Sequence, residues 1–374
     1  MSFRSFLAEC QDRGELLVVE EELSARYEIP AVMKALDGGP VLAFTNIKEH
    51  PGFVVIANVC NRERLLRALG AGSVEEAYGR LMEAAERPSE PKLAESSPAE
   101  EIVGGPDLFE LPVLTHFKGD AGPYITSALV SARSPDGSVE NVSVHRLLVL
   151  DERRMAIRMV PRHLYRLWVM AKEEGRDLGI TISIGVHPAI ILAATTPVPF
   201  GVSEFAVANS LLGGELKLVE CPGVNARAPA QAEIIMEAFI RTEEMVPEGP
   251  LVDITGTHDA VRPQPVVEVV KIMRREKPLY HAILPSGVEH RLLMGFPREA
   301  EIWRTVSKVV PRVRAVNLSL GGCGWLHAVI AIEKNVDGDA KNAIMAAFAA
   351  HPSLKHVIVV DPDIDVYDLS LIHI

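Results

Sequence analysis

The chain has 374 residues, of which 48% are hydrophobic, and its formal net charge is −12. This length allows two or three domains with a well-buried core, and the acidic balance disfavours nucleic-acid binding, which usually needs a basic surface. The sequence lacks the uninterrupted run of about 18 apolar residues that a membrane helix needs. Its start, Met1-Ser-Phe-Arg, is too polar for a secretory signal, so we expect a cytoplasmic protein without a membrane or nucleic-acid partner.

The first 102 residues are predicted to form a small α/β domain. Residues 17–20 and 52–57 have the apolar character of buried strands, and residues 74–85 carry apolar side chains at helical spacing. Residues 86–101 are rich in Pro, Ser, Glu and Lys, a composition typical of an exposed linker.

Residues 103–300 are predicted to consist mainly of strands. The clearest hairpin joins residues 142–150 to residues 155–160 through a polar turn. A second pair of strands is expected at residues 181–186 and 189–194, separated by a His-Pro step.

One long helix is predicted inside this region, over residues 231–244. Ala232, Ile235, Met236 and Phe239 belong to a wide apolar stripe at helical spacing. Ala228-Pro229, just before it, is a suitable helix start.

The last region, residues 301–374, alternates strand and helix, which is typical of an α/β layer. Strands are expected at residues 313–318, 329–332 and 356–360, and a helix at residues 340–350. The chain stops soon after a segment that looks like a strand-to-helix junction, so we expect a truncated C-terminal domain.

Three residues form a candidate metal site. The amide of Asn141, the imidazole of His163 and the carboxylate of Glu204 are a hard-to-borderline ligand set suited to Mn²⁺ or Mg²⁺. Each also has an ordinary structural alternative: a turn residue, a surface residue, and a helix start after Ser203.

Two carboxylates, Glu248 and Asp253, flank the stiff turn Gly249-Pro250 at the end of the predicted helix. Neighbouring carboxylates with an arginine in reach acquire different pKa values and can move a proton. The alternative is a solvated acidic loop.

Arg146 lies within an apolar strand, and Arg158 lies on the partner strand of the same hairpin. A guanidinium in such a place must be paired or must face a ligand, because burying it alone is costly. Asn141 and Arg146 are an odd number of residues apart, so a regular strand points them to opposite faces. We therefore expect either a bulge between them or a turn at Asn141.

Together these segments resemble the UbiD-like family of prenylated-FMN-dependent decarboxylases, and the match runs through most of the chain. The matching motifs, in order, are Gly122-Pro-Tyr-Ile-Thr, Asn141-Val-Ser-Val-His-Arg146, Val160-Pro-Arg-His163, Ser203-Glu204, Ala232-Glu-Ile-Ile-Met-Glu, Glu248-Gly-Pro-Leu-Val-Asp253, Gly338-Asp-Ala-Lys-Asn-Ala and Val360-Asp-Pro-Asp-Ile-Asp-Val.

The resemblance implies a role for each candidate residue. It assigns Mn²⁺ (or Mg²⁺), bridging to the flavin phosphate, to Asn141, His163 and Glu204, with K⁺ as a further candidate ion. It places the prenylated FMN against Val144, His145, Arg146, Arg158, Met159 and Val160. It makes Arg146, Glu248 and Asp253 the catalytic network.

The resemblance also implies an α/β (α+β) fold. A split β-barrel that binds the flavin, at residues 103–300, would be flanked by a small N-terminal α/β domain at residues 1–102 and a C-terminal α/β domain at residues 301–374. Family members are usually homo-oligomers, and a flavin prenyltransferase supplies their cofactor.

Residues 248–259 and 284–299 are similar to the archaeal branch of this family that includes anhydromevalonate phosphate decarboxylase. That likeness implies non-oxidative decarboxylation of trans-anhydromevalonate 5-phosphate to isopentenyl phosphate and CO₂, in an archaeal-type mevalonate pathway to isoprenoids. The chain departs from the branch at Leu251, where Phe is usual. The alternative substrate is a hydroxybenzoate-type aromatic acid of quinone biosynthesis. A phosphorylated substrate needs a basic clamp, for which the candidates are Lys118, His290, Arg291 and Arg298.

Overall fold

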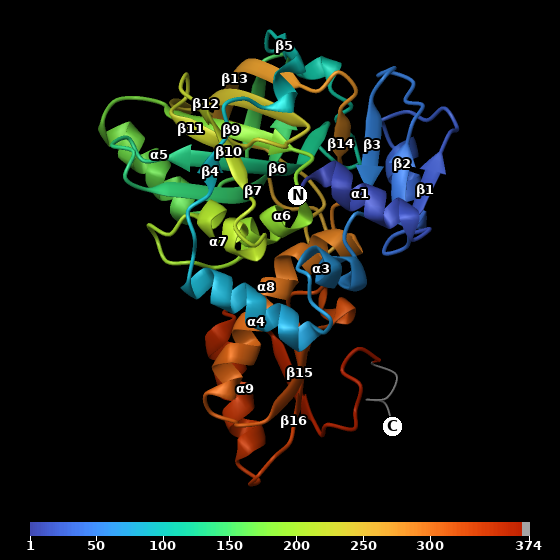
Figure 1. Cartoon of the computed structure of the whole chain (residues 1–374), viewed down its shortest axis with the longest axis vertical. Coiled ribbons are helices and arrows are strands. Elements are labelled where there is room, and N and C mark those ends of the chain that lie inside the picture. Colours follow the sequence, from blue (N-terminus) through green and yellow to red (C-terminus); the bar gives the residue numbers. More distant parts are fainter. Residues whose placement is uncertain (369–374) are drawn as a thin grey trace.

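The structure, a computed structural model, describes residues 1–368, which form three regions (Figure 1). The N-terminal region lies beside a central β-barrel, and the C-terminal region projects below both. No helix in this described part of the chain is long and apolar enough to cross a membrane.

The N-terminal region is built on a four-stranded sheet in the order β1-β2-β3-β14. Its elements are α1 (Phe3–Asp12), β1 (Leu16–Val19), α2 (Glu28–Ala35), β2 (Val41–Phe44), β3 (Val54–Ala57), α3 (Arg62–Ala68), α4 (Val74–Glu86) and, from much later in the sequence, β14 (Leu279–His281). The strand predicted at residues 17–20 exists, but the prediction that it is buried is wrong. As the edge strand of the sheet, β1 leaves Leu17 and Val18 exposed.

The helix predicted over residues 74–85 is confirmed as α4, which begins at the capping hydroxyl of Ser73. The linker predicted over residues 86–101 is less free than expected. It contains β4 (Lys92–Leu93), which pairs with β10 of the central region, and η1 (Pro98–Glu101). The buried hydroxyl of Ser97 donates to the carbonyl of Ala230. The segment is therefore attached along the barrel.

Six antiparallel strands close the central barrel in the order β12-β9-β6-β7-β8-β13, and pairing of β12 with β13 completes the ring. The barrel strands are β6 (Tyr124–Arg133), β7 (Glu140–Val149), β8 (Arg154–Ile157), β9 (Leu178–Ile184), β12 (Ile234–Glu248) and β13 (Arg262–Arg274). The other elements here are β5 (Ile102–Gly104), η2 (Leu108–Glu110), α5 (His163–Glu173), α6 (Pro188–Thr195), α7 (Glu204–Leu211), β10 (Lys217–Cys221) and β11 (Ala226–Pro229). The predicted hairpin is confirmed as β7 and β8.

The helix predicted over residues 231–244 is wrong, because the segment forms most of strand β12. β12 lies between β9 and β13, and its first half is buried on both faces. A strand of this kind needs a continuous apolar run, which imitates the stripe of an amphipathic helix. The β-branched residues Ile234, Ile235 and Ile240, and Pro247 near the end of the strand, favour the extended conformation.

The strand predicted at residues 189–194 is also wrong, because these residues belong to helix α6. Every residue of α6 from Pro188 to Ala194 is buried. The segment therefore has no polar face, and without one the helical spacing of its apolar residues cannot be seen in the sequence. The local signals favour a helix: Pro188 occupies the first turn, and the ring of His187 accepts a hydrogen bond from the amide of Ala189.

Helix α8 (Val288–Ser307) leaves the barrel, packs against α4 and α6, and leads into the C-terminal region (Figure 1). That region has a sheet in the order β15-β16-β17 with helix α9. Its elements are β15 (Val313–Leu318), η3 (Leu320–Gly322), β16 (His327–Ile332), α9 (Asp339–Ala350) and β17 (His356–Val360). The predicted strands and helix are confirmed here. Residue 300, the predicted domain boundary, lies inside α8, and the expectation about the chain end concerns residues 369–374, outside the described part.

Candidate active site

A cavity of about 720 Å³ lies where the barrel, helices α6 and α7, and helix α8 meet. Strand β7 provides one wall, and the start of α5, the end of α6 and the connection between β12 and β13 provide others. Arg298 of α8 and Trp325 reach it from the C-terminal side. A cavity of this size between regions of a chain is a usual place for a cofactor and a small substrate.

One end of the cavity brings together the predicted metal ligands. Oε1 of Glu204 accepts a hydrogen bond of 2.9 Å from the Asn141 amide and lies 3.9 Å from Nδ1 of His163. Oε2 accepts from the backbone amide of Val142 at 2.6 Å. Two ion–ligand bonds of about 2.1 Å can span a gap of up to about 4.2 Å, so one divalent ion fits between the carboxylate and the imidazole.

The charge of Glu204 favours such an ion. The side chain is buried, and burial raises the pKa of its carboxyl although the backbone amide of Val142 and the ring of His163 act in the opposite direction. A bound cation would compensate the buried negative charge. Ser203 caps α7 through its hydroxyl, which fixes the direction of the carboxylate that follows it.

Strand β7 runs past the cavity, and both of its faces contribute side chains. Asn141, Ser143 and His145 form one row: the Ser143 hydroxyl lies 3.2 Å from Oδ1 of Asn141 and 2.9 Å from Nε2 of His145. Val144 and Arg146 line the same cavity from the other face. Both expected explanations of the odd spacing are therefore wrong, because Asn141 lies within β7 and the irregular pairing affects β6.

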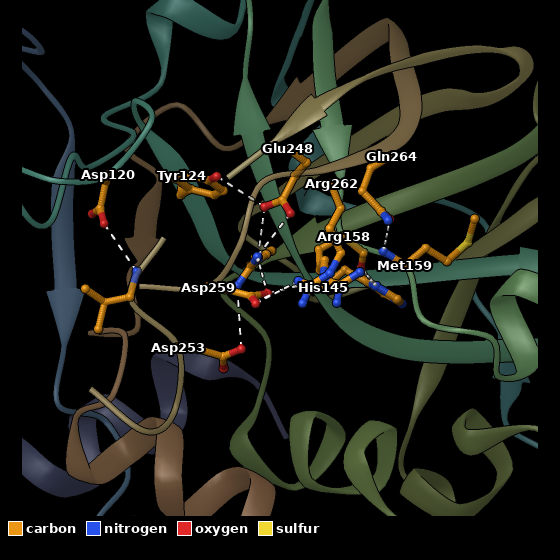
Figure 2. Close-up of polar contacts among 12 residues, drawn as sticks. Asp120, Tyr124, His145, Arg158, Met159, Glu248, Asp253, Asp259, Arg262 and Gln264 are labelled. Carbon is orange, nitrogen blue, oxygen red and sulfur yellow. Dashed lines mark hydrogen bonds and ion pairs between the residues drawn. The ribbon is translucent and has the colours of Figure 1, made fainter. Parts of the chain in front are cut away.

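Arg146 forms the centre of the second polar cluster, and its partners Glu248, Asp253 and Asp259 are labelled in Figure 2. Its Nε and Nη2 donate to the two oxygens of Glu248 at 2.9 and 3.0 Å, and Nη2 also donates to Asp259 at 3.1 Å. Nη1 lies 3.8 Å from Asp253. Burial alone would lower the pKa of Arg146, but the hydrogen bonds and charge of Glu248 outweigh it and raise this pKa.

Glu248 is completely buried at the end of β12, behind Arg146, and does not line the cavity. The hydroxyl of Tyr124 donates to it at 3.1 Å. Burial, and then the charge of Glu248, raise the pKa of Tyr124, so this hydroxyl keeps its proton. Asp253 does line the cavity, with 45% of its side chain exposed. The two predicted carboxylates therefore differ in their access to a ligand.

The connection between β12 and β13 is a compact hairpin that carries Asp253. Val252 pairs with His258, the Asp253 amide donates to the carbonyl of Thr257, and the Asp259 amide donates to that of Leu251. Outside the hairpin, the Val252 amide donates to Asp120 at 3.3 Å. The backbone thus fixes the position of Asp253.

Most residues predicted to line the flavin do line the cavity: Val144, His145, Arg146, Arg158 and Val160. Met159 does not, since its side chain is buried in the barrel core and its amide donates to Gln264 at 2.7 Å. Burial lowers the pKa of His145, so the ring is neutral, and Nδ1 donates to the carbonyl of Arg158. Gln264 and His145 therefore hold residues 158–159 in place.

The proposed basic clamp is only partly present. His290 and Arg298 line the cavity, whereas Lys118 and Arg291 do not. Arg298 is half-buried and packs over Trp325, and within residues 1–368 no carboxylate pairs with it. Burial and the nearby charge of Arg162 lower the pKa of Arg298, although the charge of Glu301 acts in the opposite direction. Burial lowers the pKa of His290 to about 4, so its ring is neutral and its Nδ1 accepts from the Ser286 amide.

Three residues with contacts at the site had no predicted role: Tyr124, Asp259 and Gln264. Tyr124 lies within the matched Gly122-Pro-Tyr motif, and Asp259 ends the segment similar to the archaeal branch. The sequence resemblance could thus have pointed to both Tyr124 and Asp259. Gln264 had no signal, because its contact with Met159 depends on the barrel.

Three family models describing 3-octaprenyl-4-hydroxybenzoate carboxy-lyase match the chain in order. The N-terminal domain matches residues 7–85, the Rift-related domain residues 92–288 and the C-terminal domain residues 291–372. The chain therefore belongs to the UbiD family of carboxy-lyases, and the predicted mixed α/β fold with a central barrel is confirmed.

Its relatives include anhydromevalonate phosphate decarboxylases of archaea. The protein of Methanothermobacter thermautotrophicus is 47% identical over 95% of this chain and 83% of its own length, and that of Aeropyrum pernix 44% over 98% and 82%. The UbiD-class enzyme HmfF from Pelotomaculum thermopropionicum, solved in complex with FMN, superposes with a TM-score of 0.97 at 40% identity, over 100% of this chain and 85% of its own. An evolved dimeric form of HmfF was solved with prFMN.

Proposed function

We propose that this chain decarboxylates trans-anhydromevalonate 5-phosphate to isopentenyl phosphate and CO₂, with prenylated FMN and a divalent metal ion bound in the cavity. The observation that carries the proposal is the cluster of Arg146, Glu248 and Asp253 beside one cavity. Identity of 47% with an anhydromevalonate phosphate decarboxylase over nearly the whole chain supports the substrate. A homo-oligomer stays a prediction.

Arg146 binds the substrate carboxylate in this proposal. Glu248 occupies Nε and Nη2 of the guanidinium, which leaves Nη1 for an anion in the cavity. A guanidinium held along one edge presents the other in a fixed direction, and such orientation lowers the barrier of the reaction. Glu248 acts here through Arg146.

Asp253 delivers the proton in this proposal. It lines the cavity, whereas Glu248 is completely buried. After CO₂ leaves, a proton must reach the carbon to which CO₂ was attached, and a carboxyl group within hydrogen-bond reach can supply it. The hairpin backbone fixes Asp253 in position for this step.

The cavity suits a flavin phosphate and a metal ion at its far end. Asn141, His163 and Glu204 would hold the ion, and Arg158, Val144 and His145 would line the flavin. When bound, prenylated FMN supplies an electron sink for decarboxylation of an unsaturated acid. The chain itself contributes binding, orientation and the proton.

Charge in the cavity favours a substrate with a second anionic group. Four arginines line it, against the two carboxylates Glu204 and Asp253, although the chain as a whole is acidic. Among the described residues Arg298 forms no ion pair, and Glu301 acts on it only through its charge. A phosphate could form one, since guanidinium groups bind phosphate through charge-assisted hydrogen bonds. We therefore favour the phosphorylated acid over a hydroxybenzoate.

The test is turnover of trans-anhydromevalonate 5-phosphate by protein loaded with prenylated FMN and Mn²⁺, with isopentenyl phosphate followed by mass spectrometry. Product that depends on the flavin supports the proposal. Turnover of a hydroxybenzoate, with none of the phosphorylated acid, would transfer the assignment to the aromatic alternative.

The variant Arg298→Gln is expected to raise KM for the phosphorylated acid by about 10-fold to 100-fold, because one charge-assisted contact of about 1.5–3 kcal/mol is lost. kcat should change by less than about threefold. Steady-state kinetics would measure both. Arg304→Gln is the matched control, since Arg304 lies on the same helix but pairs with Glu86 and Glu301. Equal KM values for both variants would remove Arg298 from the substrate site.

A further inference from the structure

Asp259 connects three arginines from three parts of the barrel. Its Oδ2 accepts from Nη2 of Arg146 on β7 at 3.1 Å and lies 3.6 Å from Nε of Arg158, just after β8. Its Oδ1 accepts from Arg262, at the start of β13, at 2.7 Å. The side chain is only 15% exposed, and Figure 2 shows it between Arg158 and Asp253.

The two cavity-lining arginines depend on this carboxylate in different ways. Arg158 has no other carboxylate partner within the described residues, so Asp259 provides its counter-charge. Arg146 also has Glu248, but Glu248 contacts only Nε and Nη2. Asp259 contacts Nη2 as well. Both carboxylates therefore bind the Nε–Nη2 edge of the guanidinium. Nη1 stays available to Asp253 and to a ligand in the cavity.

The same residue closes the hairpin that carries Asp253. The backbone amide of Asp259 donates to the carbonyl of Leu251, and its side chain fixes the end of the hairpin to Arg146. Asp253, on the opposite arm, lies 3.8 Å from Nη1 of the same arginine. Both arms of the hairpin therefore meet one guanidinium, and loosening either contact would change the distance between Arg146 and Asp253.

We propose that Asp259 is a positioning residue for decarboxylation: it holds Arg146 and Arg158 side by side and keeps the hairpin with Asp253 closed over Arg146. The inference rests on the proposed function, because it assumes that Arg146 and Asp253 act on the substrate. Asp259 itself does not line the cavity, so it acts through its neighbours.

The experiment compares Asp259→Asn, Asp259→Glu and a control, Asp151→Asn, in flavin-loaded protein. Asp151 is a more exposed aspartate that pairs with Arg154 in the β7–β8 turn. Two readouts are taken: kcat and KM with trans-anhydromevalonate 5-phosphate, and hydrogen–deuterium exchange of residues 249–262. The exchange readout does not depend on the substrate, so a wrong substrate and a wrong role for Asp259 give different results.

For Asp259→Asn we expect kcat to fall by about 10-fold to 100-fold with KM changed less than about threefold. Exchange should rise in residues 249–262 and remain unchanged in β9. Asp259→Glu keeps the charge and should recover part of kcat, whereas Asp151→Asn should match the parent protein. If Asp259→Asn does not fold, a reduced kcat in folded Asp259→Glu supports the proposal. If Asp259→Asn folds, unchanged exchange in residues 249–262 or a kcat above half the parent value would overturn the proposal. If it does not fold, a kcat of Asp259→Glu equal to the parent value would overturn it.

Discussion

Replacing Glu248 by glutamine is expected to lower kcat by at least about 100-fold while the protein stays folded and retains its flavin. Glutamine has nearly the same shape, but its uncharged amide can accept with only one atom, so its NH₂ group is placed against Nη2 of Arg146 while its oxygen accepts from Nε and from Tyr124. One hydrogen bond to Arg146, of about 1.5–3 kcal/mol with a charged acceptor, is lost, and the other becomes weaker because its acceptor is now uncharged. A loss of about 2.7 kcal/mol from the transition state corresponds to 100-fold.

Folding should survive because Arg146 keeps Asp259 as a partner. Thermal melting and the absorbance of bound flavin would verify this, and steady-state kinetics would give kcat. Glu244→Gln is the matched control: Glu244 lies on the same strand, is partly exposed, and pairs with Arg154. If kcat of Glu248→Gln stays within about threefold of the parent value, Glu248 does not orient Arg146 for the reaction.

The second large effect is expected at the metal end. Glu204→Gln should lower the affinity for Mn²⁺ by at least about 100-fold and release the flavin on gel filtration, which abolishes activity. Glu204 is the single charged member of the proposed ligand set. Mutating a residue that only hydrogen-bonds to a metal ligand typically lowers metal affinity by about 10-fold to 100-fold. Removing the charge of a ligand itself should lower the affinity at least as much.

The metal-free variant should be at least as stable as the parent protein. Glutamine can still accept the hydrogen bond from the Val142 amide, and it removes a buried negative charge. Mn²⁺ should therefore raise the melting temperature of the parent protein and of the control but not that of Glu204→Gln, because an ion stabilises the state that binds it. Exposed Glu215, next to α7, provides the control Glu215→Gln. A melting temperature that Mn²⁺ raises equally in all three proteins would refute the ligand assignment.

The sequence allowed good predictions where a local pattern determines the structure. The β7–β8 hairpin has apolar strands on either side of a polar turn, and α4 has a capping serine and a regular stripe. The candidate site residues came from ordered motifs. The structure brings Asn141, His163 and Glu204 together at one end of the cavity, and it brings Glu248 and Asp253 to Arg146, which lines the same cavity.

The secondary-structure predictions failed in segments that are buried on all sides, because such segments lack the alternation of apolar and polar residues. Strand β12 and helix α6 are both almost continuous apolar runs, so periodicity cannot distinguish a strand from a helix in either. What decides between them is the neighbours: β12 has β9 and β13 on its two edges, whereas α6 packs against α7. Local sequence carries little of that information.

The role of Asp259 could not be predicted for a different reason. Its contacts reach Arg146 and Arg158, about 100 residues earlier in the chain, only because the β12–β13 hairpin folds back on itself. Spacing along the sequence gives the order of these residues but not the direction of the hairpin. The same applies to Gln264, whose partner Met159 is 105 residues away.

Strand β14 follows all the barrel strands in the sequence, and this position affects how the protein folds during synthesis. Strand β3 pairs on one edge with β14, which the ribosome makes only after the entire barrel. The carboxylate of Glu289, just beyond β14, accepts hydrogen bonds from the amides of Val59 and Cys60, 230 and 229 residues earlier. A nascent N-terminal region therefore keeps an open sheet edge throughout synthesis of the barrel, and open edges invite pairing with other chains. Such distant contacts also form slowly, so the demand on chaperones during translation should concentrate on this edge.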